Sequence, residues 1–543
     1  MDNSPVKMLQ QIRRRVQAVT YGNPLYRLML DQGSVPDRLR LSIPDPWPGD
    51  AKLGQALIAS QPALFDDAAP FGEMGRKSLL TFDFLRDLRA VGSDLARRKA
   101  VSMIHEWLED QEEWDEDAWA PDVLGARLAN WIAFFDFYGS AASHDFTKKM
   151  IVSMVRQLRH LIHVAPAHLT GIEGLCAIKG LVYGGLALID GQRALGIALT
   201  LLTRQIDAEV LPDGGTVFRN PVLHAEMLRL LIDLRTALRV AQMEMPAELT
   251  LAIARMVPAL KFFRHGDGGL ALFNGAREGS ALTLDATLTM AEVKGRVLKR
   301  LAHMGYERLT AGRSLLLVDS AGPPPRPYDQ GAHAGLMSFE FSVGRERLIT
   351  NCGALENHDP AWRRALAATA AHNTVTLGDT NACEVLVEGG IGHRPRTVDL
   401  QRYEQEGVQY VDMTHDGYAP RQRVMLQRVL ALTEEGDELR GKDVLMGASG
   451  RDFTVRWHIH PDVNVMLAQG GGSALLRTPS GSGWRFRVHG RFGEGLGLEA
   501  SVYCAHGAPR RTLQLFVTGR TTEEPLFVEW TLTREKTKKG SRA

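Results

Sequence analysis

The chain has 543 residues, of which 44% are hydrophobic and 23% are charged. This composition is typical of a globular protein, and the length predicts two to four domains. Lysine and arginine (64) balance aspartate and glutamate (63), so the net charge gives no support to nucleic-acid binding. The four cysteines are far apart and form no CxxC pair, which excludes a disulfide framework and a zinc-finger pattern.

The amino terminus lacks the apolar core of a secretory signal, and no apolar run is long enough to cross a bilayer. We therefore expect a cytoplasmic chain without a transmembrane segment. An arm of helical and extended segments is expected over residues 1–70.

Residues 71–310 carry apolar side chains at a spacing of three to four, which predicts a series of amphipathic helices. Breaks fall at turn-forming residues, for example Pro121 and Pro246. The helices recur about every 20–45 residues, as in an array of helical hairpins. Gly180 and Gly184 lie in one apolar helix and would let neighbouring backbones approach closely.

After about residue 310 the apolar period changes from near four to two. A dozen strands follow one another without intervening helices, and residues 311–535 are therefore expected to form an antiparallel sandwich. The last eight residues, 536–543, are expected to be a polar tail. The predicted fold class is α+β and multidomain, with a helical domain followed by a β-domain.

Five segments together carry a family resemblance. They are WAPDVLGARLANWI (119–132), DGGTVFRNPVLHAEMLRLL (213–231), GAHAGLMSFEFSVGRERLITNCG (331–353), AAHNTV (370–375) and VRWHIHPDV (455–463). In this order the chain resembles the heparinase II/III-like polysaccharide lyases. The resemblance implies an N-terminal incomplete α/α toroid and a C-terminal antiparallel β-sandwich. It also implies elimination beside a uronic-acid carboxylate, with a base, an acid and a group that neutralises the carboxylate.

The segment 213–231 supplies the first candidate site. Arg219 offers a bidentate fork for a carboxylate, Asn220 can neutralise that carboxylate by hydrogen bonding, and His224 can act as base or acid. Alternatively, Asn220 caps the helix that Pro221 begins, and His224 packs between helices. The tyrosine that the family uses is not evident here, and Tyr328 is the preferred substitute, with Tyr183 and Tyr306 as alternatives.

The second candidate site lies in the predicted sandwich. His333 precedes a strand, Asn351 ends the next strand and His372 opens a third, so hairpins can bring them together. Two imidazoles and a third donor suit Zn²⁺, and the resemblance implies a metal at these positions. Alternatively, His372 binds loop backbone and fastens the sandwich edge. The family often carries His and Asp where this chain has Gly331 and Gly335, which is the main departure from its pattern.

Three further residues are candidates for binding an acidic sugar. Trp362 can stack on a sugar ring, and Arg363 can pair with its carboxylate. His168 stands roughly where the resemblance implies a carboxylate-neutralising residue. Two histidines of the RWHIHP segment, His458 and His460, share one face of a strand and are expected to bind metal or to pack.

The leading functional hypothesis is a polysaccharide lyase that acts on an acidic, uronate-containing polysaccharide or oligosaccharide. One alternative is a glycan-binding or envelope-polysaccharide protein that has kept the scaffold and lost the elimination chemistry. Another is a glycan hydrolase, for which Glu173 and Glu340 are possible carboxylates. Zinc is the only cofactor expected. The resemblance favours the periplasm or cell envelope, against the cytoplasmic expectation from the amino terminus.

Overall fold

The structure, a computed structural model, describes residues 15–60, 76–110, 113–164, 168–188, 191–355, 359–490 and 495–535. The chain divides into two compact units. The first unit comprises residues 1–208, 226–253 and 286–292, and the second comprises residues 209–225, 254–285 and 293–543. The expected polar tail, 536–543, lies outside the described residues. Within the described ranges, no helix has both the length and the apolar character needed to cross a membrane.

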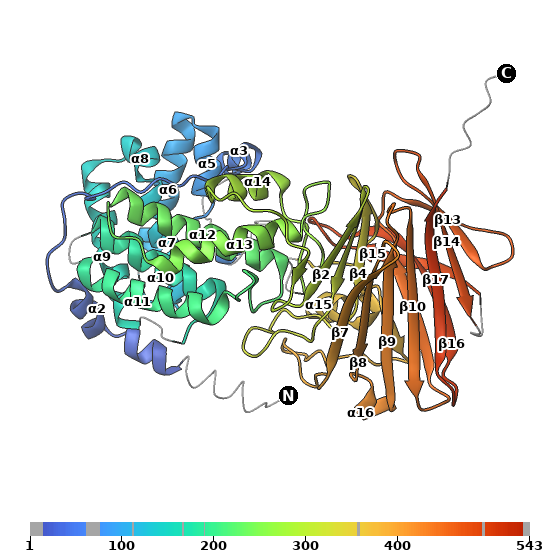
Figure 1. The fold of residues 1–543 in the computed structure, drawn as a ribbon. Helices are drawn as coiled ribbons and strands as arrows, with labels where there is room; N and C mark the ends of the chain where they lie inside the picture. The colour runs from blue at the N-terminus through green and yellow to red at the C-terminus, as the bar shows by residue number, and fades with distance from the viewer. Residues whose placement is uncertain are drawn as a thin grey trace, which may run out of the picture. The chain divides into compact units, whose positions relative to one another are not determined.

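Among the described residues, one helix follows another up to Met290, as the apolar spacing predicts (Figure 1). They are α2 (Pro24–Asp31), α3 (Ala51–Ala59), α4 (Arg76–Thr81), α5 (Leu85–Val91), α6 (Asp94–Asp110), α7 (Pro121–Ala133), α8 (Phe135–Tyr138), α9 (His144–Val164), α10 (Gly171–Ala187), α11 (Gly191–Glu209), α12 (Pro221–Val240), α13 (Ala247–Phe262) and α14 (Ala281–Met290).

Helices α7 and α10 of the first unit pack closely against each other. A Cβ atom added to Gly180 would lie 2.4 Å from the Cα of Gly125, and one added to Gly125 would lie 2.4 Å from the carbonyl oxygen of Cys176. Real Cβ atoms do not approach that closely, so only glycine allows this crossing. The expectation that Gly180 permits close helix packing is confirmed.

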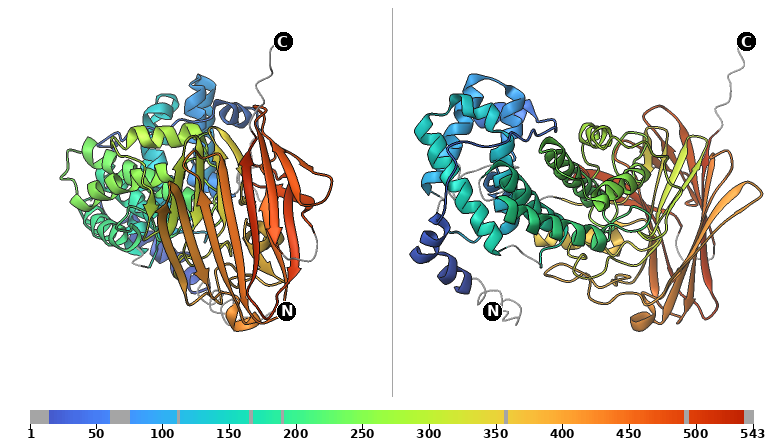
Figure 2. Two further views of the ribbon diagram at one scale, coloured as in Figure 1. Left: turned by 45° about the vertical axis from the view of Figure 1, so that its right-hand side comes forward. Right: turned by 60° about the vertical axis from the view of Figure 1, so that its left-hand side comes forward.

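The strands of the second unit form three antiparallel sheets. Five strands pair in the order β1-β2-β3-β4-β5, eight in the order β12-β13-β14-β17-β10-β9-β8-β7, and four in the order β15-β16-β11-β6. Figure 2 shows the long strands of the eight-stranded sheet running side by side. The strands are β1 (Arg300–Leu301), β2 (Tyr306–Ala311), β3 (Ser314–Asp319), β4 (Phe339–Val343), β5 (Glu346–Ile349), β6 (Val375–Leu377), β7 (Val398–Gln405), β8 (Val408–His415), β9 (Val424–Leu432), β10 (Glu438–Gly447), β11 (Asp452–His458), β12 (Asn464–Leu467), β13 (Ser473–Arg477), β14 (Gly483–Gly490), β15 (Gly497–Tyr503), β16 (Arg510–Arg520) and β17 (Leu526–Arg534).

A large aromatic core holds these sheets together. Trp457 of β11 lies between Phe486 of β14 and Trp530 of β17, with ring centroids 4.9 and 5.6 Å away. Phe339 of β4 stacks on Trp530 at 5.4 Å. Each of these side chains is at most 2% exposed. Burial of such rings supplies the main driving force for packing the sheets.

A buried ion pair connects this core to the loops that carry the candidate site. Arg428 of β9 pairs with Asp443 of β10, with Nε 2.6 Å from Oδ1. The same guanidinium donates hydrogen bonds to the carbonyl oxygens of Met337 (3.0 Å) and Asn373 (2.5 Å). Because these two carbonyls belong to separate loops, Arg428 fixes the loops relative to each other.

Candidate active site

The candidate site lies within the second unit, where several loops meet the first turn of α12. Asn220 is the N-cap residue of that helix, since its Oδ1 accepts hydrogen bonds from the N–H groups of Val222 (2.8 Å) and Leu223 (3.1 Å). Its Nδ2 donates to the carbonyl oxygen of Asn274 at 2.8 Å. Proline at position 221 suits the first helical position. The capping interpretation of Asn220 is therefore confirmed, and one N–H of its amide group is left without an assigned acceptor among the described residues.

Two histidines form the second part of the site. His333 Nδ1 lies 3.2 Å from His372 Nε2, and His372 Nδ1 lies 2.8 Å from the carbonyl oxygen of Ala368. A carbonyl only accepts, so His372 carries its proton on Nδ1 and its Nε2 is an acceptor. His333 must then donate from Nδ1, which leaves its Nε2 as an unprotonated base. The contacts therefore determine the tautomers of both rings.

His333 Nε2 and the side-chain amide of Asn220 both lie next to Gly275, and we call the immediate surroundings of these three residues the recess. A Cβ atom added to Gly275 would lie 2.6 Å from the carbonyl oxygen of Gly331, 3.4 Å from His333 Nε2 and 3.7 Å from Asn220 Nδ2. Gly275 has a φ of +79°, a conformation that favours glycine. A Cβ atom added to Gly331 would have no heavy atom within 4 Å. Open space therefore borders Gly331, whereas Gly275 packs tightly against the Gly331 carbonyl, next to a base and a hydrogen-bond donor.

Asn274 holds the residues of this recess in place through hydrogen bonds. Its Nδ2 donates to the hydroxyl of Tyr306 at 2.8 Å, and its Oδ1 accepts from the backbone N–H of His333 at 3.4 Å. Tyr306 is fully buried and its hydroxyl donates to the carbonyl oxygen of Arg219 at 2.5 Å. Burial raises the pKa of Tyr306. Its hydroxyl is thus engaged in holding the loop and does not face the recess.

The structure gives Arg219 a supporting role in place of the predicted substrate contact. Its guanidinium pairs with Asp319 at 2.5 Å and donates to the carbonyl oxygens of Met304 (2.7 Å) and Gly305 (2.9 Å), and also to those of residues 321 and 322. The residue is only 5% exposed. These contacts occupy all three guanidinium nitrogens. Arg219 therefore holds the start of α12 against the segments that flank β2 and β3, and its guanidinium is not available to bind a substrate carboxylate.

His224 also has an internal environment. It is fully buried, its Nε2 lies 3.0 Å from the carbonyl oxygen of Met256, and its Nδ1 has no hydrogen-bond partner among the described residues. Burial lowers its pKa to about 4. The packing interpretation fits these contacts better than a role as base or acid.

Tyr328 stays available as a candidate. Its ring packs against Phe218, with centroids 5.5 Å apart, and its hydroxyl interacts with Glu209. Burial and the Glu209 carboxylate raise its pKa, so the phenol is protonated at neutral pH. Phe218 lies two residues before Asn220, and Tyr328 lies five residues before His333. Tyr183, one of the alternatives, is buried within α10.

The predicted sugar-binding residues lie on three different segments. Trp362 and Arg363 belong to α15 (Pro360–Ala367), where Trp362 is partly exposed and Arg363 is exposed and donates to the carbonyl oxygen of Val387 at 2.6 Å. His168 is exposed in the turn before α10, within the first unit. Their roles in binding sugar stay predictions.

The donors expected to bind zinc are arranged for hydrogen bonding. His333 and His372 bond directly to each other, and Asn351 Oδ1 accepts from the backbone N–H (3.1 Å) and side-chain amide (3.4 Å) of Asn373. Asn351 Nδ2, which cannot ligate a cation, is buried without a partner among the described residues. Among all the residues that the structure describes, no group of three or more His, Cys, Asp or Glu side chains is placed to hold a metal ion. The residues present do not fit the expected zinc.

His372 packs so closely on Gly335 that this position has no room for the aspartate that the family resemblance implies. A Cβ atom at position 335 would lie 2.6 Å from Cδ2 of His372 and 3.0 Å from its Nε2. We expect Gly335→Ala to lower the free energy of unfolding by about 1–3 kcal/mol through overpacking, while Gly331→Ala changes it by less than about 0.5 kcal/mol. Urea unfolding of the two variants measures the difference. Equal stability of both would contradict the close packing of His372 on Gly335.

Several buried histidines make stability depend on pH. Burial lowers the pKa of His224, His372 and His415 to about 4, and it lowers that of His333 well below its usual value. In the unfolded chain these histidines have a pKa of about 6.5. Between about pH 4 and pH 6.5 the unfolded chain therefore binds more protons than the folded chain. We expect the free energy of unfolding to be fully retained above about pH 6.5 and to fall as the pH drops toward 4. Urea midpoints at about pH 7 and about pH 5 measure this loss, and equal midpoints would contradict it.

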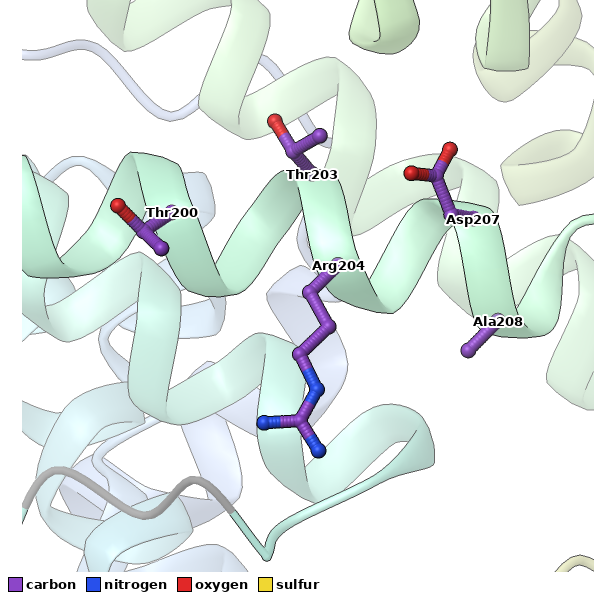
Figure 3. Close-up of a pocket in the computed structure, with 5 residues that line it drawn as sticks. All are labelled: Thr200, Thr203, Arg204, Asp207 and Ala208. Atoms are coloured by element: carbon purple, nitrogen blue, oxygen red, sulfur yellow. The ribbon is translucent and has the colours of Figure 1, made fainter.

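A separate surface hollow of about 740 Å³ lies along α11 in the first unit (Figure 3). The described residues that line it are Thr200, Thr203, Arg204, Asp207 and Ala208. Their spacing places them on one face of the helix. They offer one guanidinium and one carboxylate three residues apart, and we assign no chemistry to them.

Comparison with known proteins agrees with this architecture. The family description "Heparinase II/III-like, C-terminal" matches residues 293–531. The chain is also 30% identical to FtsZ-localized protein C of Caulobacter vibrioides (strain NA1000 / CB15N) over 548 residues, which covers 92% of this chain and 93% of that protein. The chain belongs to the heparinase II/III-like family.

Solved structures show the fold that this heparinase II/III-like chain adopts. A crystal structure of heparinase III matches with a TM-score of 0.75 at 11% identity, and covers 97% of this chain and 91% of that one. Heparan sulfate lyase HepC from Pedobacter heparinus matches with a TM-score of 0.62 at 14% identity, over 90% of this chain and 83% of that one. The predicted fold class, an α/α toroid followed by an antiparallel β-sandwich, is confirmed.

Sequence reasoning named Asn220, His333 and His372 but missed Asn274 and Gly275, which shape the recess between them. A signal for these two was present, because Asn-Gly is a dipeptide typical of turns with positive φ. In the structure both residues have positive φ, +49° and +79°. The position of this turn beside His333 could not be read from the sequence.

Proposed function

We propose that this chain is a polysaccharide lyase that cleaves a uronate-containing acidic glycan by β-elimination, with Asn220 and His333 at its reacting centre. The observation that carries the proposal is the convergence of His333 Nε2 and Asn220 Nδ2 on the recess beside Gly275. A base and a carboxylate-binding donor a few ångströms apart are what proton removal beside a carboxylate requires.

In this proposal the uronate carboxylate accepts a hydrogen bond from the Asn220 amide. This bond withdraws charge from the carboxylate and acidifies the proton on the adjacent ring carbon. His333 Nε2 accepts that proton, and the resulting imidazolium keeps its Nδ1–H bond to His372. The leaving oxygen departs as the ring double bond forms.

The low pKa of His333 keeps it neutral, and so able to accept a proton, at physiological pH. A low pKa also makes it a weak base. Binding of an anionic sugar beside the ring favours the imidazolium and raises that pKa. The substrate's own carboxylate therefore strengthens the base only when the substrate is in place.

Tyr328 is the proton donor that we assign to the leaving oxygen. Its raised pKa keeps the phenol protonated, which is the state that a general acid needs. It lies in the segment that leads to His333, and its ring packs against Phe218 in the turn before α12 that carries Asn220. The resemblance to a family that uses Tyr and His supports this pairing.

Two glycines of one loop provide a matched test of the recess. Gly275→Ala places a methyl group between His333 Nε2 and Asn220 Nδ2, whereas Gly279→Ala meets only Leu284 and Leu270 at 3.7 and 3.8 Å. Both residues have positive φ, so both variants carry a backbone cost of about 1 kcal/mol. The methyl group of Gly275→Ala also lies 2.6 Å from the Gly331 carbonyl oxygen, so the urea midpoint of each variant is measured beside its activity.

We expect Gly275→Ala to lower kcat/KM for elimination by about 100-fold or more, since small misplacements at a reacting centre have effects of that size, and Gly279→Ala to keep near wild-type activity. The assay follows the ultraviolet absorbance of unsaturated uronate over a panel of acidic glycans. Equal activity of the two variants argues against the recess as the reacting centre. Failure of the wild-type chain to produce the chromophore from any glycan argues against the lyase proposal itself.

A second candidate function is favoured by Gly331, which stands where the family often carries a catalytic histidine. In this reading the chain binds glycan without cleaving it, and it shares with FtsZ-localized protein C the localisation that the name of that relative describes. Imaging a fluorescent fusion together with FtsZ tests the localisation. Glycan binding without turnover, unchanged in a His333→Ala variant, would favour this function over the lyase.

The hydrolase alternative has less support. Glu340 is fully buried, with one carboxylate oxygen 3.0 Å from His265 Nε2 and the other accepting from the N–H of Asn351 at 2.9 Å. Glu173 lies in the first turn of α10 and its carboxylate is 3.7 Å from Lys77 Nζ. Because Glu340 is buried and both of its carboxylate oxygens are hydrogen-bonded, it cannot contact the glycosidic bond of a substrate.

A further inference from the structure

A second cluster of reactive side chains lies on the four-stranded sheet, on groups that the elimination chemistry does not use. Ser501 Oγ of β15 lies 2.7 Å from His458 Nδ1, at the end of β11. The other ring nitrogen, His458 Nε2, lies 3.0 Å from the carbonyl oxygen of Ala370. Cys352 Sγ is 3.5 Å from His458 Nδ1 and 3.8 Å from Ser501 Oγ.

The hydrogen bonds determine the protonation of this histidine. Because a carbonyl oxygen only accepts, His458 carries its proton on Nε2 and presents the lone pair of Nδ1 to Ser501. A hydroxyl, a base nitrogen and an acceptor that orients the base form the arrangement by which enzymes activate a serine. His458 is 3% exposed and is held in a single orientation.

A backbone donor accompanies the pair. The N–H of Val502, the residue after Ser501, interacts with the Cys352 thiol. A thiol is only a weak hydrogen-bond acceptor. An oxyanion that forms when Ser501 attacks a carbonyl carbon can therefore take its place as the acceptor of the Val502 N–H. The N–H of the residue after the nucleophile stabilises the oxyanion in many serine hydrolases.

The surroundings suit an acyl group attached to a sugar. Ser501 is partly exposed and lies on the edge strand of its sheet. Three partly buried apolar side chains, Leu355, Trp362 and Val502, pack on the cluster that contains Cys352. Trp362 is the residue whose position before His372 suggests stacking on a sugar ring. An apolar surface next to the hydroxyl favours a neutral ester over a charged substrate.

We propose that Ser501 is a nucleophile that removes acyl groups from carboxylic esters, with His458 as its base. The Ser501 hydroxyl proton moves to His458 Nδ1 while Oγ bonds to the carbonyl carbon of the ester. The carbon–oxygen bond to the sugar breaks, and the sugar hydroxyl takes the proton from Nδ1. Water then attacks the acyl-serine, gives a proton to Nδ1 and releases the acid, and Oγ recovers its proton. The net reaction is ester plus water to acid plus alcohol.

The serine is the nucleophile in this proposal and the cysteine is not. Ser501 Oγ is closer to the base than Cys352 Sγ, at 2.7 against 3.5 Å. Cys352 is only 3% exposed, and burial raises the pKa of its thiol to about 12. The sulfur therefore stays protonated and inside the fold.

This activity is separate from the elimination site. The carbonyl of Ala368 orients His372, and the carbonyl of Ala370 orients His458, so one turn serves two histidines. The reacting groups themselves, His333 in one case and Ser501 in the other, belong to different segments.

The experiment treats the full chain with a fluorophosphonate probe and locates the label by mass spectrometry, and it measures hydrolysis of p-nitrophenyl acetate in parallel. We expect one label on Ser501 and a fall in hydrolysis of about 10²–10⁴-fold in Ser501→Ala. Ser482→Ala, at another partly exposed serine of the same unit, keeps both label and hydrolysis.

Ser501→Ala removes a single oxygen from a partly exposed side chain, so loss of folding does not complicate its interpretation, and its urea midpoint checks this. The proposal is overturned if Ser501 takes no label, or if hydrolysis persists in Ser501→Ala. It is also overturned if the acyl group is found on Cys352.

Discussion

Replacing His333 by alanine is expected to lower kcat/KM for elimination by about 10²–10⁴-fold, the usual contribution of a general base. His333 Nε2 is the nitrogen that the contacts of His372 and Ala368 leave unprotonated, and it faces the recess beside Gly275. The ultraviolet absorbance of the unsaturated product measures the loss.

The matched control for this variant is His489→Ala, at an exposed histidine near the end of β14. Removal of His333 leaves the buried Nε2 of His372 without its donor, which costs about 1–3 kcal/mol of stability. Activity is therefore measured well below the unfolding midpoint of each variant. Full activity of His333→Ala would show that proton removal depends on another group.

Replacing Arg219 by methionine is expected to lower the free energy of unfolding of the second unit by about 3–5 kcal/mol. The substitution leaves Asp319 buried without its partner and deprives several carbonyl oxygens of their donor. Urea unfolding, followed by tryptophan fluorescence of the sandwich core, measures the loss.

Arg440→Met is the matched control, because Arg440 pairs with Glu438 at 3.0 Å on the eight-stranded sheet of the same unit, where the arginine side chain is about half exposed. Exposed pairs of this kind contribute about 0–1 kcal/mol. A variant of Arg219 with unchanged stability and a raised KM would restore the substrate-binding role that the sequence suggested. The stability difference between the two arginine variants therefore distinguishes a structural from a substrate-binding residue.

Part of the candidate site could be predicted because it depends on neighbours along the chain. An asparagine followed by proline at the start of an apolar-periodic segment is a helix start, and Asn220 caps α12 through the N–H groups two and three residues later. The pairing of His333 with His372 was also expected, although as ligands of a metal. The structure brings them together as hydrogen-bond partners.

The role of each polar side chain in the site was not predictable, since it depends on partners far away in the sequence. Arg219 has the chemistry of a carboxylate fork, yet its partners lie 85 to 103 residues further along the chain. His224 has the chemistry of an acid or base, yet a carbonyl 32 residues away and complete burial make it a packing residue. Sequence states which groups are present but not which of them already have partners.

The sequence alone determined the division of this protein into a helical part and a strand-rich part, because the repeat of apolar residues has a period near four in one and two in the other. That period follows from the geometry of the helix and the strand and needs no distant contact. Only the tertiary structure decided which nitrogen of His333 is unprotonated, and that this nitrogen and the Asn220 amide both lie next to Gly275. Tautomers and recesses arise from contacts between loops, and the loops meet only after the sheets have packed.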